Sequence, residues 1–329
     1  MLRPHLPTTD QIYILSASGD SIRRITDDDK GFNTPVWSPD GKLLANQQYT
    51  ERRRTKVDLI TPKGKLVRRW DAGEQGVGAP PSFSPDGRLL AFPWTRWSKT
   101  RDAVVGDLSI VPVAGGPRRV VARRAVGPAS WSPDGRNLLY ERGDIIGSFY
   151  QGQPADWDRH DIWMAKTNGR GSHEVLRDVD GAPIYSPAGD RFLFFRGLWP
   201  EETVWTAGLD GSDQRRVGGT YRYALANWAP PGGIWALVSG RQHSRAFLFR
   251  PDGEREELPE AIRSGPMDWS RDGRRIAWAE GPKIKTIRPD GTGERVLVHF
   301  RGDGSCGQVS WAPGGRRLAI VCAQFEGDA

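Results

Sequence analysis

The stretch from Asp156 to Asp161 holds the densest local group of side chains that could bind a cation. It reads Asp-Trp-Asp-Arg-His-Asp, so three carboxylates and the imidazole of His160 fall within one short segment. Carboxylate oxygens suit Ca²⁺ and imidazole suits transition metals. The same side chains can also satisfy turns and one another in a solvated loop, which is the interpretation we adopt. A second acidic run, Asp27 to Asp29, lacks the regular spacing of a calcium loop.

The remaining candidates for catalysis are few. The chain has five histidines, and their spacing matches no metal-binding motif. It contains no Gly-x-Ser-x-Gly string, the turn that carries the nucleophile of propeller-linked peptidases. We therefore predict no catalytic residue, no metal site and no cofactor.

Aromatic and arginine side chains offer a different chemistry, because these residue types anchor most protein interfaces. Several of them fall between the segments expected to form strands rather than inside those segments. We predict that these loop residues form the binding site. The candidates, with one histidine beside them, are Trp94, Arg96, Trp97, Tyr150, Trp157, His160, Trp199, Tyr221, Arg222 and Tyr223.

A repeated phrase indicates which elements position these loops. An aromatic residue, a Ser-Pro-Asp-Gly-like turn and an apolar run recur seven times, between 41 and 54 residues apart. Repeats of this period are typical of propellers or solenoids. The phrases begin at Trp37, Phe83, Trp131, Tyr185, Trp228, Trp269 and Trp311.

The turn itself predicts a hairpin. Proline presets φ, aspartate can accept a backbone hydrogen bond, and glycine tolerates positive φ. A second Gly-containing hairpin follows each phrase except the last, so each repeat should carry four antiparallel strands. The chain opens at Gln11 with a second hairpin and finishes at Trp311 with a first hairpin. The two halves should complete the seventh blade and leave no open sheet edge.

The phrase Trp-Ser-Pro-Asp-Gly, followed by basic and apolar residues, resembles the repeat of TolB-like β-propellers, a family related to WD repeats. The resemblance runs from Gln11 to about Val321. It implies an all-β fold, a seven-bladed propeller formed by residues 1–329 as one domain. Its members include periplasmic scaffolds, substrate-gating domains of peptidases and some polysaccharide lyases. The fifth and seventh phrases carry Gly-Gly in place of Asp-Gly.

Composition limits the partners. The formal charge is +7, which favours an acidic partner. The arginine pairs are distributed over the last strand of several repeats, where charge blocks edge-to-edge pairing, and this spread argues against nucleic acid. No apolar run is long enough for a membrane span, and residues 1–10 lack the apolar core of a secretory signal. As written, the chain is expected in the cytoplasm, or outside it if it is a processed domain, and as a monomer.

The two cysteines can be placed by counting outward from the last turn. If Ala312 faces Arg316, Cys306 faces Cys322. Facing strand residues come close enough for a disulfide, whereas two reduced thiols are expected in a cytosolic protein. The sequence leaves both states open.

These observations predict a non-catalytic propeller that binds a protein or peptide partner. The inter-hairpin loops should all emerge on the face opposite the tight Gly turns, and this face should carry the binding site. The alternative is an enzyme, a metal-assisted lyase or hydrolase acting on a glycan or lactone, with its site at the mouth of the central channel.

Overall fold

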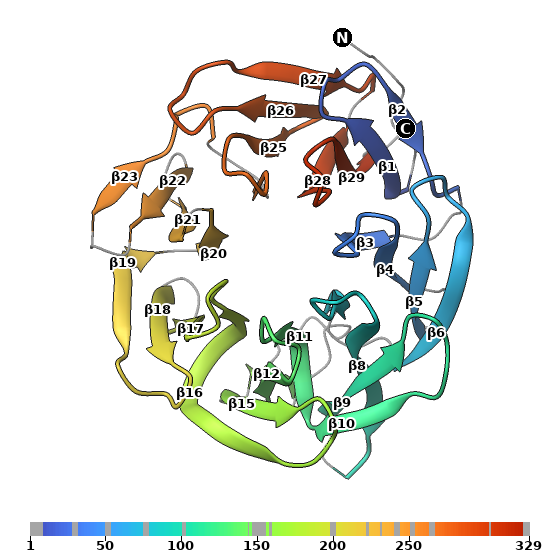
Figure 1. Ribbon diagram of the computed structural model, residues 1–329, viewed down its shortest axis with the longest axis vertical. Coiled ribbons are helices and arrows are strands. Elements are labelled where there is room, and N and C mark those ends of the chain that lie inside the picture. The colour runs from blue at the N-terminus through green and yellow to red at the C-terminus, as the bar shows by residue number, and fades with distance from the viewer. Residues whose placement is uncertain are drawn as a thin grey trace. The chain divides into compact units, whose positions relative to one another are not determined.

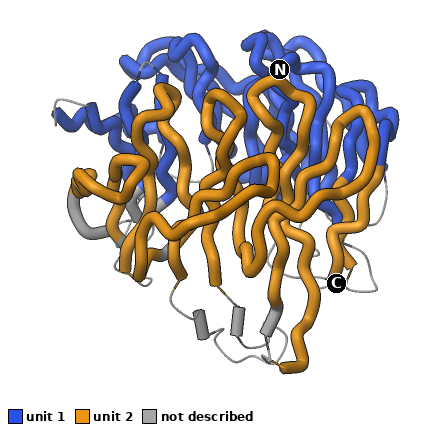
Figure 2. The backbone as a smooth tube through the Cα atoms, turned by 60° about the horizontal axis from the view of Figure 1, so that its bottom comes forward, with its two compact units in different colours: residues 1–48, 58–68, 221–329 blue, residues 49–57, 69–220 orange. Residues whose placement is uncertain are grey.

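The computed structural model consists of β-strands, and no helix occurs among the residues it describes. Those residues are 9–27, 32–49, 54–74, 79–100, 103–143, 145–146, 156–157, 160–197, 202–221, 224–230, 232–239, 244–250, 254–262, 267–302 and 304–324. Over these ranges, membrane-spanning helices are likewise absent. The chain divides into two compact units (Figure 2), one formed by residues 1–48, 58–68 and 221–329, the other by 49–57 and 69–220.

The first unit contains three four-stranded antiparallel sheets, in which each strand pairs with the next one named. Two are continuous in sequence, which is what one hairpin followed by another predicts. They are β20 (Ala224–Ala229), β21 (Gly233–Ser239), β22 (Ser244–Phe249) and β23 (Arg255–Glu257), and β24 (Met267–Trp269), β25 (Ile276–Glu280), β26 (Lys283–Ile287) and β27 (Arg295–His299). The third is β2 (Ile22–Arg24), β1 (Gln11–Ser16), β29 (Arg317–Gln324) and β28 (Gly304–Trp311). The unit also holds the pair of β3 (Phe32–Trp37) and β4 (Leu44–Tyr49).

The second unit is built on two longer runs of paired strands. One follows the order β11 (Ala125–Trp131), β12 (Asn137–Arg142), β15 (His160–Lys166), β16 (Ser172–Tyr185), β17 (Arg191–Arg196), β18 (Glu202–Gly208) and β19 (Arg215–Tyr221). The other contains β14 (Asp156–Trp157), β13 (Ile145–Ile146), β9 (Ala103–Pro112) and β8 (Leu89–Ser98), with β10 (Arg119–Arg123) on β9 and β7 (Ser82–Phe83) on β8. Several strands contribute residues to both units, among them β5 (Arg54–Ile60) and β6 (Leu66–Glu74).

The two ends of the described chain share one sheet, as the sequence predicts. Strand β1 lies between β2 and β29 (Figure 1), and it pairs with β29 from Gln11 opposite Cys322 to Ser16 opposite Arg317. In β28, Cys306 lies opposite Cys322, and a disulfide joins them across Cα atoms 4.0 Å apart. The predicted cysteine register is confirmed, and of the two redox states left open the structure contains the disulfide.

The repeated turns show why the phrase needs its polar residues. In the third phrase, Ser132 donates its hydroxyl to Asp134 at 2.6 Å and accepts the N–H of Asn137 at 2.9 Å. Asp134 also accepts the N–H of Arg136, and Gly135 has a φ of 71°. The hydroxyl and carboxylate therefore satisfy the backbone inside the turn. The same arrangement is present at the turns beginning at Ser38, Ser84 and Ser270.

In two of the phrases, the opening tryptophan donates a hydrogen bond to a neighbouring sheet of its own unit. Trp131 is buried, and its indole N–H donates to the carbonyl of Ser82 at 3.1 Å. Trp37 is also buried and donates in the same way to the carbonyl of Ser310 at 3.2 Å. The large ring fills the space between sheets while its one polar group is satisfied.

Candidate binding site on the β8–β9 hairpin

The longest hairpin of the described chain carries the first three candidate residues. The prediction that they lie in a loop is wrong, because Trp94, Arg96 and Trp97 belong to the paired strand β8. Strands β8 and β9 have ten residues each, and they stay in register from Leu89 opposite Pro112 to Ser98 opposite Ala103. Successive residues of a strand alternate between the faces of a sheet. Trp94 and Arg96 therefore occupy one face of the hairpin, and Trp97 occupies the other.

Two glycines bring backbone segments close to this hairpin. A Cβ atom at Gly106 would lie 2.3 Å from the carbonyl oxygen of Ala125, the first residue of β11. A Cβ atom at Gly73 would lie 2.0 Å from the carbonyl oxygen of Thr95, which faces Gly106. No side chain fits at either position, so only glycine permits these approaches. The hairpin is thus held against β6 on one side and β11 on the other at the level of Thr95.

Beyond that level, two short strands extend the sheet. Ile145 of β13 lies opposite Val104 of β9, and Trp157 of β14 lies opposite Ile145. Val104 in turn lies opposite Trp97. Residues that face one another across neighbouring strands share a face of the sheet. Trp97, Val104, Ile145 and Trp157 therefore occupy one cross-strand row, which we call the apolar row.

The apolar row lies farther along the hairpin than the contact with β11. It is one step of two residues beyond Thr95 and Gly106, or about 7 Å along the strands. Trp97 is 39% exposed, one of the largest apolar side chains at the surface of the described structure. Arg96 and Lys99 beside it are also exposed. The tip therefore presents an aromatic ring and two cations to the surroundings.

On the opposite face of the hairpin, an arginine side chain covers Trp94. The guanidinium of Arg118 lies over the ring of Trp94, 4.8 Å from the ring centroid, and donates to the hydroxyl of Ser109 at 2.9 Å. A stacked guanidinium satisfies the ring face electrostatically and shields it from water. Trp94 is thus half-buried beneath Arg118, and Trp97 is the more accessible of the two candidate tryptophans.

His160 lies at the base of the connection that carries β13 and β14. It is 3% exposed, and its Nδ1 is hydrogen-bonded to the carboxyl group of Glu141, which is also buried. A Cβ atom at Gly143 would lie 2.0 Å from the imidazole, so the ring occupies the space above that glycine. The Gly143 N–H donates to the Arg124 carbonyl at 3.0 Å. These contacts fix where the chain leaves β12 and enters β15.

The other candidate residues are described in part or not at all. For Trp157 and Tyr221 the structure gives the backbone position, in β14 and at the end of β19. Tyr150, Trp199, Arg222 and Tyr223 lie outside the described residues, as do Asp28, Asp29 and Asp158.

Sequence reasoning missed four residues around the site: Val104, Ile145, Glu141 and Arg118. The pair Ile145–Ile146 is the one signal that could have pointed to them, because adjacent β-branched residues in a polar loop favour a short strand.

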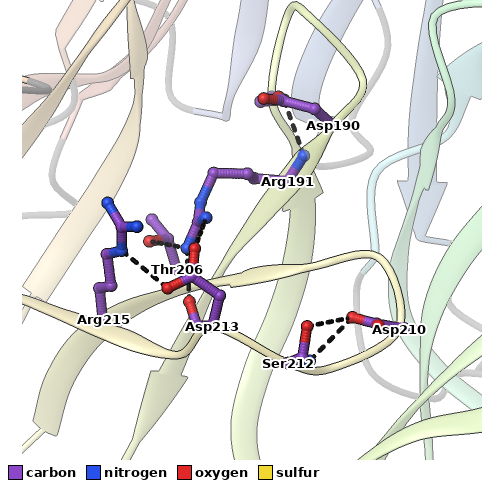
Figure 3. A network of polar contacts seen from close by, with 8 residues as sticks. Asp190, Arg191, Thr206, Asp210, Ser212, Asp213 and Arg215 are labelled. Atoms are coloured by element: carbon purple, nitrogen blue, oxygen red, sulfur yellow. Dashed lines mark hydrogen bonds and ion pairs between the residues drawn. The ribbon is translucent and has the colours of Figure 1, made fainter.

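A cluster of charged side chains lies near the turn between β18 and β19 in the second unit. Figure 3 shows Arg191 and Arg215 converging on Asp213. Asp213 forms ion pairs with Arg191 at 2.5 Å and with Arg215 at 2.9 Å, and the Ser212 hydroxyl donates to Asp210 at 2.6 Å. Hydrogen bonds from Arg191 and Arg215 hold the pKa of Asp213 below its usual range. Both cations of the cluster are thus paired with Asp213. Across the described part of the chain, no group of three or more His, Cys, Asp or Glu side chains could hold a metal ion.

Comparison with known proteins places this geometry in a fold class. No protein-family model matches the chain. Among solved structures, oligogalacturonate lyase in complex with manganese superposes with a TM-score of 0.67, at 14% identity over 99% of both chains. A protein assigned as TolB from Agrobacterium tumefaciens gives 0.50, at 20% identity over 95% of this chain and 97% of that one. The β-propeller domain of the Trilobed protease from Pyrococcus furiosus gives 0.56, at 11% identity over 92% and 95%. The fold is therefore that of a TolB-like β-propeller.

Two relatives share sequence with parts of the chain. An uncharacterized protein of Agrobacterium fabrum is 26% identical over 204 residues, which is 60% of this chain and 61% of the relative. The uncharacterized peptidase YuxL of Bacillus subtilis is 29% identical over 138 residues, or 40% of this chain and 18% of the peptidase. The matched regions thus span less than two thirds of either relative.

Proposed function

We propose that this protein is a seven-bladed β-propeller whose inter-hairpin connections bind a protein or peptide partner without catalysing a reaction. Three sheets of four strands, one of them shared by both ends of the described chain, support the blade count. The observation that carries the binding function is the apolar row, which ends in an exposed tryptophan on a long, well-paired hairpin. A rigid aromatic side chain on a paired strand loses little entropy on binding.

The test is affinity capture from the native host by the wild-type chain and by the double variant Trp97→Ala/Trp157→Ala, followed by mass spectrometry. We expect the double variant to lose the partners that the wild type retains, because its row lacks both aromatic anchors. Circular dichroism and thermal unfolding should show a folded variant. If the folded variant captures the same partners, the binding site lies elsewhere on the molecule.

The second candidate function is an enzyme, a metal-assisted lyase or hydrolase of a glycan or lactone with its site at the central channel. The full-length similarity to oligogalacturonate lyase favours this alternative. Incubating the chain with oligogalacturonate and Mn²⁺ tests it, since a lyase product carries a new double bond that absorbs ultraviolet light. Metal-dependent turnover would replace the binding proposal as the main function.

A further inference from the structure

The disulfide lies at one end of the sheet that joins β1 to β29, which we call the joined sheet. At this end β1 begins at Gln11, β29 ends at Gln324 and β28 begins at Gly304. Cys322 of β29 lies opposite Cys306 of β28 on one side and opposite Gln11 of β1 on the other. Strand ends are where a sheet opens most readily. The covalent bond therefore holds the part of the joined sheet that would otherwise open first.

The bond also belongs to the core between two sheets of the first unit. Both cysteines are buried in one cluster with Leu297 and Val298 of β27, in the neighbouring sheet. The N–H of Cys306 donates to the carbonyl of Gly281, between β25 and β26, at 2.9 Å. Opening the joined sheet at this level therefore also uncovers apolar side chains of its neighbour.

One of the two sulfur atoms lies beside an open space. Cys322 is completely buried, whereas Cys306 is 5% exposed. The next residue, Gly307, interrupts the pairing of β28 with β29 and is exposed. A Cβ atom added at Gly307 would meet no atom within 4 Å. A small thiol can therefore approach the Sγ atom of Cys306 from the side of Gly307.

The redox state of the bond depends on an external reagent. These two cysteines are the only ones in the chain, so no third thiol of the protein can exchange with them. Because the cysteines are only 16 residues apart, the disulfide closes a loop of modest size. Reducing such a bond restores conformational freedom chiefly to the opened or unfolded chain. The fold should therefore persist after reduction, while the end of the joined sheet opens more often.

We propose that the Cys306–Cys322 disulfide is a redox-sensitive clasp, which keeps the end of the joined sheet closed when oxidised and lets it open when reduced. The inference is independent of the proposed binding function. The reductant is a dithiol. Its first thiolate attacks the Sγ atom of Cys306 and forms a mixed disulfide, and the sulfur of Cys322 leaves as a thiolate that takes up a proton. The second thiolate of the reductant displaces the sulfur of Cys306, which is also protonated, so the reductant ends as a cyclic disulfide.

The experiment uses the full chain, first oxidised with glutathione disulfide and then treated with the dithiol dithiothreitol. Thiol titration counts the reduced cysteines, and thermal unfolding gives the melting temperature. We expect no free thiol before treatment and two after it, with a fall in the melting temperature of about 5 °C.

Hydrogen exchange followed by mass spectrometry locates the opening. In the first minutes of exchange, the peptides that contain β1 and β29 should exchange at least about tenfold faster after reduction. The peptide that contains β12, in the second unit, should stay protected over the same time.

The double variant Cys306→Ala/Cys322→Ala is the control, because it lacks the bond and should not respond to dithiothreitol. Three results would overturn the proposal. The first is that two free thiols remain after treatment with glutathione disulfide. The second is that the folded protein releases no thiol to dithiothreitol. The third is that the reduced protein matches the oxidised one in melting temperature and in exchange.

Discussion

Two sheets of this molecule join segments that are far apart in the sequence, and they bury their apolar residues differently. In the sheet of the first unit that joins β1 to β29, Tyr13 and Leu15 contribute to one core cluster, while Ile12 and Ile14 contribute to another. Both of its faces are therefore buried. In the second unit, the extension of the β8–β9 hairpin leaves Trp97 exposed. A sheet that is buried on both faces gains stability from both of them, whereas the exposed part of Trp97 adds less buried apolar area.

The largest effect is expected from removing the first strand of the joined sheet. A chain lacking residues 1–26 loses β1 and β2, so it uncovers the edge of β29 and both core clusters. We expect aggregation or loss of cooperative unfolding. Size-exclusion chromatography and thermal unfolding measure this. Removal of residues 1–8 alone, which retains β1, is the control. A soluble 27–329 chain with an unchanged melting temperature would show that β1 does not complete this sheet.

A buried carboxylate of β24, which accepts a hydrogen bond from β28 of the joined sheet, makes the stability depend on pH. Asp268 accepts the N–H groups of Trp311 and Trp269, and burial raises its pKa to about 6. The folded state then holds this proton more tightly than the unfolded state, for which the value is near 3.8. The protonated Asp268 therefore contributes its full share to the free energy of unfolding below pH 4. This contribution, about 3 kcal/mol in total, is lost as the pH rises through 6.

Comparing the wild type with Asp268→Asn isolates this effect. Between pH 4 and pH 7, the free energy of unfolding of the variant should rise by about 3 kcal/mol relative to that of the wild type. Urea unfolding measures this difference. Asp272→Asn is the matched control of opposite sign, because a hydrogen bond from Ser270 lowers the pKa of Asp272. A difference between wild type and Asp268→Asn that stays constant with pH would contradict the burial argument.

At the hairpin, Gly106→Ala tests the close approach that supports the apolar row. Its Cβ would meet the carbonyl of Ala125, so the backbone must move, at a cost of about 1–3 kcal/mol. Urea unfolding gives the stability, and affinity capture gives the effect on the row. Gly307→Ala in β28 is the matched control, since no atom lies within 4 Å of its added Cβ. Equal effects of the two substitutions would show that the approach at Gly106 is not constraining.

The smallest effect on stability is expected at Trp97. Because its side chain is already 39% exposed, Trp97→Ala should cost about 1 kcal/mol, against about 3–5 kcal/mol for Trp131→Ala at a buried position. Chemical denaturation of both variants measures the contrast. If Trp97→Ala costs as much as Trp131→Ala, the ring at 97 is part of the core, and the distinction between the two sheets fails.

The sequence by itself predicted the all-β fold, the repeated turns, the sheet formed by both chain ends and the facing cysteines. Turn chemistry explains this success, because a few adjacent residues determine where a hairpin forms. In the third phrase these residues are Ser132, Asp134 and Gly135. Once a hairpin is set, the strand period of two fixes the positions outward from it, as far as Cys306 and Cys322.

Only the tertiary structure brought Trp97, Val104, Ile145 and Trp157 into one row. Strands of two residues, such as β13 and β14, carry no periodic pattern, and their pairing with β9 depends on how a long connection closes. The same holds for the stacking of Arg118 on Trp94 and for the bond between His160 and Glu141, since each joins residues whose separation in sequence carries no local signal. Local chemistry therefore determined the blades, and long-range packing decided which aromatic residues remain exposed.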